Sequence, residues 1–189
     1  MTEHKLNHMM IDVETMGITS DTTVLAIGVV VFNPETGEFG QQRHYLPPVD
    51  GQGGTISFDT IRWWLKTDAA KFAAMLEQDA KVGQPMDWDA ISDDIMALTK
   101  AFNVDTIWAN GIDFDIPILS AALDRTSTTN PLSAFTYAQR RDVRQWKFAA
   151  AHNGWEQPTR PDDLPKHDAL ADAIWQARVV CSLWAYLSK

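Results

Sequence analysis

The chain has 189 residues, 45% of them hydrophobic and 22% charged, which suits one folded domain with a substantial core. Its net charge of −9, from 16 basic and 25 acidic residues, argues against a protein that grips nucleic acid by general electrostatics. The objection weakens if some of the acids bind metal. There is no long uncharged apolar stretch, so we expect no membrane span.

The sequence fits a cytoplasmic protein. Residues 1–5 lack the apolar core of a signal peptide. The only cysteine, Cys181, lies in an apolar helical pattern, where we expect a buried small hydrophobe rather than a reactive thiol. Both features agree with a reducing compartment.

The first expected elements are three strands. Residues 8–13 form an apolar run, and residues 23–32 are β-branched and apolar, as in a buried strand. Turn residues at 33–37 should return the chain as a third strand over 38–46. These strands predict an antiparallel meander, which is followed by a loop rich in Pro and Gly.

Helices and strands are then expected to alternate. Ser57 or Asp59 could cap a helix that contains Trp63 and Trp64. The later expected elements are a helix near 68–78, an amphipathic helix over 87–102, a strand over 104–109, a helix over 113–123, a strand over 134–139, and helices over 142–150 and 167–187. This order predicts an α/β fold with a mixed five-stranded sheet flanked by helices, in a single domain over residues 1–189.

Asp12 and Glu14 lie two residues apart at the end of the first expected strand, so their side chains project from the same face. Two carboxylates this close repel each other unless a cation lies between them, and a hard divalent metal is the natural candidate. The alternative is a pair of solvated acids at a strand end.

A second acidic pair, Asp113 and Asp115, follows the sharp Asn110-Gly111 turn. Acids in the first turn of a helix are favourable for capping and dipole reasons alone, and this interpretation suits Asp113. Asp115 instead begins an apolar, core-facing stretch, where an unpaired carboxylate is costly. A bound metal would remove that cost.

The third group is His167, Asp168 and Asp172 at the start of the last expected helix. His167 and Asp172 are five residues apart, roughly 140° around a helix axis, but His167 could swing from a flexible helix start toward the site that Asp172 faces. Asp168 and Asp172 are one turn apart, a repulsive pair unless one of them is bound to something. Alternatively, His167 is an ordinary helix-start residue and Asp172 a solvated acid.

These three groups, in this order, resemble the motifs of the DEDDh 3′-5′ exonucleases, DnaQ-like members of the ribonuclease H-like superfamily. The matching residues are Asp12, Glu14, Thr15 and Gly17 in the first motif, Asn110, Phe114, Asp115 and Leu119 in the second, and His167 and Asp172 in the third. The resemblance runs from residue 8 to about residue 176. Residues 57–65 and 141–144 are similar to the small stand-alone exonucleases of phages and mycobacteria, some of them exoribonucleases, so a phage-encoded protein in the host cytoplasm is one expectation.

The resemblance implies a ribonuclease H-like fold and a two-metal phosphodiesterase. The implied metal ligands are Asp12, Glu14, Asp115 and Asp172. Carboxylates without a Cys/His set suit Mg²⁺ or Mn²⁺ and argue against zinc. His167 is the implied general base on the nucleophilic water. The implied activity cuts single-stranded RNA or DNA from the 3′ end and releases nucleoside monophosphates.

The resemblance also implies contacts with the terminal nucleotide. The candidates in the motifs are Thr15, Met16, Gly17, Asn110 and Phe114. Trp63 and Trp64 are adjacent on a helix and cannot share a face, so one is expected to pack inside while the other stacks on a base. We assign Trp64 as the candidate, although the pattern does not decide between the two, and core or dimer contacts for both are the alternative.

One basic strip stands out in this acidic chain, formed by Arg140, Arg141, Arg144 and Lys147. It could bind backbone phosphates or be a solvated helix face. The choice between RNA and DNA stays open, because recognition of the 2′-hydroxyl depends on pocket geometry.

Two alternatives to a stand-alone exonuclease remain. One is a non-catalytic nucleic-acid-binding or interaction module that keeps the fold; the full set of four acids and a histidine argues against it. The other is a proofreading subunit bound to a polymerase, which we rank low because no extra docking tail is evident. A homodimer is plausible by analogy with small relatives.

Overall fold

A mixed sheet organises the structure, a computed structural model that describes residues 6–189. Residues 1–5, on which the expectation of no signal peptide rests, lie outside the described part. The strands are β1 (His8–Thr15), β2 (Val24–Phe32), β3 (Phe39–Leu46), β4 (Gln84–Pro85), β5 (Thr106–Ala109) and β6 (Arg140–Asp142). The α-helices are α1 (Phe58–Thr67), α2 (Ala69–Leu76), α3 (Trp88–Ala101), α4 (Ile112–Thr126), α5 (Val143–Ala151) and α6 (Ala169–Leu187).

Among the described residues the sheet has six strands in the order β4-β3-β2-β1-β5-β6. The expected meander is present, because β1 pairs antiparallel with β2 and β2 with β3. Strands β5 and β6 extend the sheet in parallel beyond β1, and β4 pairs in parallel with β3. The α/β class and the mixed sheet are therefore confirmed, but the strand count of five was wrong.

The difference in strand count has two local causes. Strand β4 has only two residues, one of them a proline, so it carries no periodic signal. The strand expected over 134–139 is replaced by two short 3-10 helices, Pro131–Ala134 and Tyr137–Gln139. A capping box between Thr136 and Gln139 fixes the second of these turns, so that β6 begins only after it.

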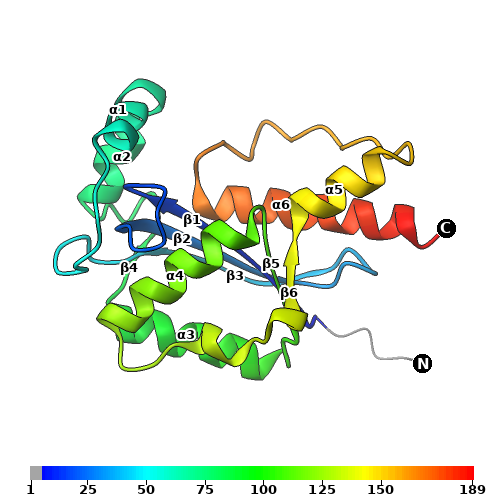
Figure 1. Cartoon of the computed structure of the whole chain (residues 1–189), viewed down its shortest axis with the longest axis horizontal. Helices are drawn as coiled ribbons and strands as arrows, with labels where there is room; N and C mark the ends of the chain where they lie inside the picture. Colours follow the sequence, from blue (N-terminus) through cyan, green and yellow to red (C-terminus); the bar gives the residue numbers. More distant parts are fainter. Residues whose placement is uncertain (1–5) are drawn as a thin grey trace.

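Helices cover both faces of the sheet (Figure 1). Helices α3 and α4 lie on one face and α5 and α6 on the other, while α1 and α2 lie at one end. The alternation of β1 follows this division, since Met9, Ile11 and Val13 pack in the core beneath α3 and α4, whereas Met10 packs in the core with α6. Asp12 lies two residues after Met10 on the same strand, so its side chain projects to the same face of the sheet, toward α6.

Helix α6 packs unusually close to the sheet at Gly28, the residue paired with Asp12 on β2. A Cβ placed on Gly28 would lie 2.0 Å from the carbonyl oxygen of Ala169. Only glycine permits this approach, which brings the first turn of α6 against β1 and β2. In the described part of the chain, no helix has both the length and the apolar character needed to cross a membrane.

Candidate functional site

Three carboxylates from two elements converge on the α6 side of the sheet. Asp12 and Glu14 come from β1, and Asp172 comes from the first turn of α6. One carboxylate oxygen of each lies within 4.8 Å of the others. Gln176, one turn after Asp172, donates from Nε2 to Asp12 Oδ1 at 2.6 Å and so fixes the orientation of that carboxylate. Strand alternation and the close approach of α6 therefore build this acidic cluster from motifs about 160 residues apart in the chain.

Asp115 approaches the same place from the start of α4 and is only 4% exposed. Its Oδ1 accepts a hydrogen bond from the backbone N–H of Val13 at 3.1 Å, which ties α4 to β1 between the two acids of the first motif. Gly111, with φ of +129°, makes the sharp turn before α4, and the Arg144 guanidinium packs over it. Asp113 is exposed, as its role as a helix-start acid predicted.

Burial and the repulsion between neighbouring carboxylates raise the pKa values of Asp12 and Glu14. Burial raises the pKa of Asp12 well above its ordinary value, and the charges of Asp115, Glu14 and Asp172 raise it further. Burial, followed by the charge of Asp172, raises the pKa of Glu14 to about 8, although Lys71 opposes the shift. Burial likewise raises the pKa of Asp115 to about 7, against the hydrogen bond from Val13.

This donor set fits a divalent cation. Carboxylate oxygens are the ligands that Mg²⁺ and Mn²⁺ prefer, and a cation would relieve the repulsion that raises these pKa values. The four expected metal ligands therefore fall into two groups in the structure. Asp12, Glu14 and Asp172 have oxygens close enough to share one ion, while Asp115 lies beside them and is held by a backbone hydrogen bond.

His167 lies just before α6 rather than inside it, contrary to the expected helix over 167–187. Asp168 is the N-cap residue, and it accepts from the backbone N–H of Ala171 at 3.0 Å. His167 itself has φ of +57°, the left-handed region that non-glycine residues seldom adopt. Burial lowers the pKa of its imidazole, although the charge of Asp172 opposes this.

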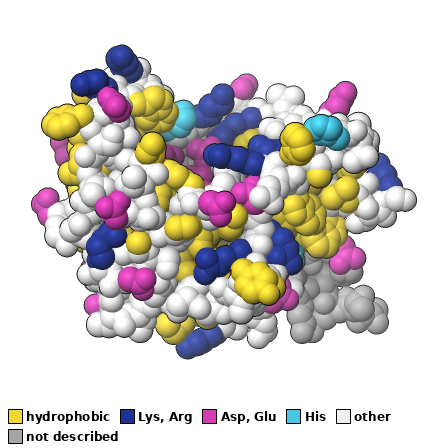
Figure 2. All heavy atoms as spheres, viewed as in Figure 1, with side chains coloured by type: hydrophobic (Ala, Val, Ile, Leu, Met, Phe, Trp, Pro, Cys, Tyr) yellow, Lys and Arg dark blue, Asp and Glu magenta, His cyan; other side chains and the backbone are white. Residues whose placement is uncertain are grey.

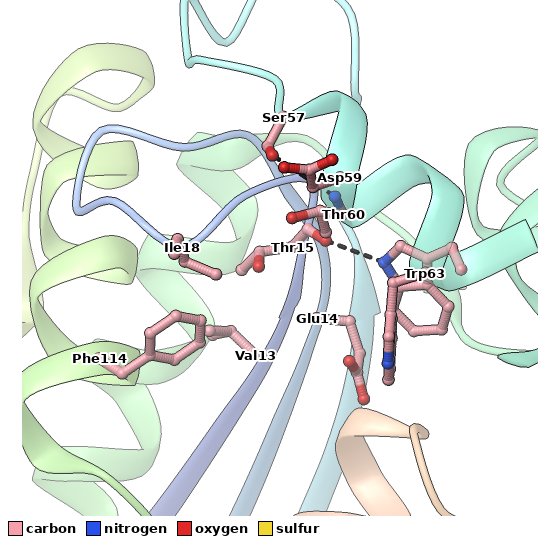
Figure 3. Close-up of a pocket in the computed structure, with 10 residues that line it drawn as sticks. Val13, Glu14, Thr15, Ile18, Ser57, Asp59, Thr60, Trp63 and Phe114 are labelled. Atoms are coloured by element: carbon pink, nitrogen blue, oxygen red, sulfur yellow. Dashed lines mark hydrogen bonds between the residues drawn. The ribbon is translucent and has the colours of Figure 1, made fainter. Parts of the chain in front are cut away.

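A pocket of about 470 Å³ adjoins the acidic cluster (Figure 3). Glu14 belongs to both. Val13 and Phe114 line one side of the pocket, and Trp63 lies across from them beside Glu14. The remaining lining residues are Thr15, Ile18, Ser57, Asp59, Thr60 and Trp64. Aromatic walls of this kind suit a nucleobase.

The adjacent tryptophans divide between core and pocket as expected. Trp64 is 1% exposed and donates from Nε1 to the carbonyl oxygen of Thr15 at 3.0 Å. Trp63 is 43% exposed, and its ring meets that of His167 edge-on at 4.8 Å. The geometry therefore favours Trp63, rather than the assigned Trp64, as the ring available for stacking.

The other expected substrate contacts do not all reach this pocket. Thr15 and Phe114 line it, whereas the side chain of Met16 is 6% exposed and packs in the core. Gly17 lies against Thr22, and Asn110 lines a second, smaller pocket together with Asp172.

The four residues of the basic strip have different surroundings in the structure. Arg140 and Arg141 donate to backbone carbonyls of residues 135, 138 and 140, so they hold the turn before β6. Arg144 lies near Asp115, and Lys147 lines the smaller pocket. On the face shown in Figure 2, Lys and Arg side chains gather between α1 and α5 next to recessed acidic side chains.

Three polar residues near the acids were missed in the sequence, namely Gln176, Lys71 and Arg160. Lys71 Nζ donates to the carbonyl oxygen of Lys166 at 3.2 Å. Arg160 donates to Asp172 Oδ1 at 2.5 Å. Gln176 could have been found from its helical spacing to Asp172, but Lys71 and Arg160 carry no local signal because their loops and helices meet the site only in three dimensions.

Comparison with known proteins gives a family and a fold. Residues 7–184 match the family model described as the 3′-5′ exoribonuclease Rv2179c-like domain. A solved structure of exonuclease I is similar in fold, with a TM-score of 0.66 at 17% identity over 96% of this chain and 43% of that one. Comparison with curated protein sequences gave no match.

Two complexes of the Escherichia coli enzyme show the same fold. The zinc-bound form of the exonuclease I complex with single-stranded DNA has a TM-score of 0.64 at 15% identity, covering 96% of this chain and 42% of that one. The complex with a dT13 oligonucleotide has a TM-score of 0.58 at 17% identity, covering 93% and 40%. This chain therefore spans about two fifths of the length of these exonuclease I chains. The family match and the shared fold confirm the resemblance found in the motifs.

Proposed function

The chain belongs to the Rv2179c-like family of 3′-5′ exoribonuclease domains, and on that premise we propose that it releases nucleoside monophosphates from the 3′ ends of single-stranded RNA with the help of divalent metal ions. The observation that carries the proposal is the position of Glu14, which belongs both to the acidic cluster and to the wall of the aromatic pocket. A terminal nucleotide in that pocket has its phosphodiester beside the carboxylates.

Asp12, Glu14 and Asp172 would hold the metal, with Asp115 supporting the site from α4. When bound, two Mg²⁺ or Mn²⁺ ions would supply stabilisation of charge on the attacking and leaving oxygens. Gln176 would keep Asp12 oriented through its hydrogen bond. Arg144 and Lys147 would offset phosphate charge near the cluster, which the acidic chain as a whole cannot do.

His167 would accept the proton of the attacking water. Its lowered pKa leaves the imidazole neutral at physiological pH, with a lone pair available as a base. Trp63 meets its ring edge-on, and Asp172 is close enough to influence its charge. The imidazole would therefore lie between the base-binding pocket and the acids.

The terminal base would lie between Trp63 and Phe114, which come from opposite sides of the pocket (Figure 3). Stacking of this kind tolerates any base. Ser57, Asp59 and Thr60 on the upper wall offer hydroxyl and carboxylate groups to the sugar. A 2′-hydroxyl could hydrogen-bond there, which supports RNA as the substrate.

Single-stranded DNA is the second candidate substrate, because exonuclease I complexes with single-stranded DNA share the fold. The test is digestion of matched RNA and DNA oligonucleotides, labelled at the 5′ end, with Mg²⁺ or Mn²⁺. We expect a ladder of shortened 5′-labelled products, formed faster from RNA, and none with Asp12→Ala. Faster digestion of DNA would reverse the substrate assignment.

The same assay distinguishes the non-catalytic alternative. A binding module would retain both strands uncut in the wild type and in Asp12→Ala, with metal making no difference. We further propose that the protein acts in the cytoplasm. That it forms a homodimer stays a prediction, and sedimentation of the purified protein would measure its oligomeric state.

A further inference from the structure

Arg160 makes a three-way contact at the acidic cluster. It lies in the connector over residues 152–168, between α5 and α6. Its guanidinium donates from Nη1 to Asp172 Oδ1 at 2.5 Å, from Nε to the carbonyl oxygen of Leu164 at 2.7 Å, and from Nη2 to that of Pro165 at 2.6 Å. The side chains of Arg160 and Asp172 are 17% and 18% exposed, so this is a largely buried pair.

This contact competes with a cation for Asp172. The second oxygen, Oδ2, accepts from the backbone N–H of Asp168 at 3.2 Å, so both oxygens of Asp172 are already engaged. A guanidinium hydrogen bond to a carboxylate is one of the stronger polar contacts in proteins. A divalent ion at Asp172 must therefore displace or share the donor that Arg160 supplies.

A second set of acceptors lies within reach of the connector. Arg160 lines a pocket of about 160 Å³ together with Asn110, Asp172 and Gln176. Within residues 6–189, Asn110 Oδ1 and Gln176 Oε1 are buried without a hydrogen-bond partner. Buried acceptors without a donor are costly, so the pocket favours a donor such as a guanidinium. Lys147 also lines this pocket.

The same guanidinium holds the chain just before His167. The carbonyls of Leu164 and Pro165 are three and two residues before it, and the carbonyl of Lys166 is held by Lys71. His167 has a left-handed backbone that surrounding contacts must maintain. A movement of Arg160 therefore changes the support of the histidine as well as the charge at Asp172.

We propose that Arg160 is a positioning residue that couples cation binding at Asp172 to the placement of His167. When a cation binds, the Arg160 guanidinium leaves Asp172 and donates instead to Asn110 Oδ1 and Gln176 Oε1 in the smaller pocket. The inference rests on the proposed function, since it takes the acidic cluster as a metal site. Without metal, Arg160 neutralises Asp172. With metal, its guanidinium turns into the pocket, which loosens its hold on the two carbonyls before His167.

The test is Arg160→Gln in the full chain, with Mn²⁺ binding measured by titration calorimetry without substrate. Removing the competing donor should lower the Kd for Mn²⁺ about tenfold, equivalent to about 1.4 kcal/mol. Amide hydrogen exchange across residues 160–167 should become faster, because the two carbonyls lose their anchor. Arg178→Gln, an equal change of charge at an exposed position on the same helix as Asp172, should leave both measurements unchanged.

Arg160→Lys separates the two effects. A lysine keeps the charge near Asp172, but its donors share one nitrogen and cannot span the three acceptors that the guanidinium fork reaches, so Mn²⁺ affinity should stay near wild type while exchange still accelerates. If wild-type protein binds Mn²⁺ and Arg160→Gln binds it equally or more weakly, Arg160 does not compete at Asp172 and the inference fails alone. If the wild type binds no Mn²⁺, the metal-dependent function fails with it.

Discussion

Single side chains around the acidic cluster orient one another through hydrogen bonds. Gln176 engages one oxygen of Asp12, so the other can serve a cation. The N–H of Val13 engages Asp115 in the same way. His167 differs, because within residues 6–189 its imidazole meets the rings of Trp63 and Trp64 edge-on and forms no hydrogen bond. Its side chain is thus free to bond with water, which is what the proposed base requires.

Replacing His167 by alanine should lower kcat by about 10²- to 10⁴-fold, the usual contribution of a general base. Mn²⁺ affinity and thermal stability should change little, because the side chain is partly exposed and is not in the acidic cluster. Steady-state digestion of labelled RNA and a thermal melt measure the two effects. Near wild-type turnover in the folded variant would remove His167 from the mechanism.

The tryptophan pair offers a matched comparison. Trp63→Ala should raise KM about tenfold with a small loss of stability, since one stacked base is worth about 1–3 kcal/mol. Trp64→Ala should instead lower the free energy of unfolding by about 3–5 kcal/mol, because it empties a fully buried site and leaves the Thr15 carbonyl unpaired. Substrate titration and urea denaturation of both variants are the measurements. A larger KM effect in Trp64→Ala would restore the original assignment.

The residues that could be predicted from the sequence are those whose geometry is local. The spacing of Asp12 and Glu14 on a strand, and the position of Asp115 at a helix start, follow from repeating backbone geometry. Arg160 and Lys71 could not be found this way, because each reaches the acids through a tertiary contact. Neither residue stands at a helix or strand spacing from the motifs, so no repeating pattern reveals the contact.

Among the elements, the approach of α6 to β2 determines the geometry of the site. Gly28 faces the first turn of α6, and Asp12 is its partner on β1. The helix can therefore place Asp172 beside Asp12 only because residue 28 has no side chain. The acidic cluster depends on this packing distance as much as on the acids themselves.

Gly28→Ala should weaken Mn²⁺ binding although it changes no polar group. Its Cβ would meet backbone atoms of Ala169 and Leu170, which cannot rotate away, so α6 must shift and carry Asp172 with it. We expect a loss of about 1–3 kcal/mol in stability together with a higher Kd for Mn²⁺. Urea denaturation and titration calorimetry measure the two effects.

Gly37→Ala is the control for Gly28→Ala. Gly37 has φ of +73° and open space around its Cβ position, so alanine should cost about 1 kcal/mol from backbone strain alone. Mn²⁺ affinity should stay at the wild-type value. If both variants weaken binding equally, general destabilisation rather than the position of α6 explains the effect.

Most long elements could be predicted because their apolar periodicity is strong, as in α3 and β2. The predicted type or start of an element was wrong where short-range hydrogen bonds override that pattern. The Thr136–Gln139 capping box turns an apparent strand into a 3-10 helix, and the Asp168 cap starts α6 two residues later than expected. The late start matters, because it leaves His167 in the connector before α6 instead of inside the helix.

At the scale of the whole molecule, the acidic cluster and two partly buried histidines, His8 and His44, respond to pH in opposite ways. Burial lowers the pKa of His8 and of His44, so their contribution to stability falls as pH drops below about 6.5. Glu14 and Asp115 have raised pKa values of about 8 and about 7. Their contribution is complete below the unfolded pKa values and is lost as pH rises through 7 to 8.

The metal-free protein should therefore lose about 2 kcal/mol of stability between pH 6.5 and 8.5, as Glu14 and Asp115 ionise in the folded state. Saturating Mg²⁺ or Mn²⁺ should suppress most of this loss, because a bound cation stabilises the ionised carboxylates. Urea denaturation with EDTA or with metal, across this pH range, is the measurement. Asp12→Asn should abolish the metal-dependent part, and a metal-free stability that rises over this range would contradict the assignment.

The shared position of Glu14 has a thermodynamic consequence. The Glu14 carboxylate belongs both to the acidic cluster and to the wall of the aromatic pocket. Binding of a cation at the cluster should therefore change the affinity of the pocket for a nucleotide. Thermodynamic linkage is reciprocal. If a bound cation raises the affinity for a nucleoside monophosphate by some factor, the bound nucleotide raises the affinity for the cation by the same factor. Product retention after cleavage would then rise with metal concentration, making excess metal an inhibitor of turnover as well as its requirement.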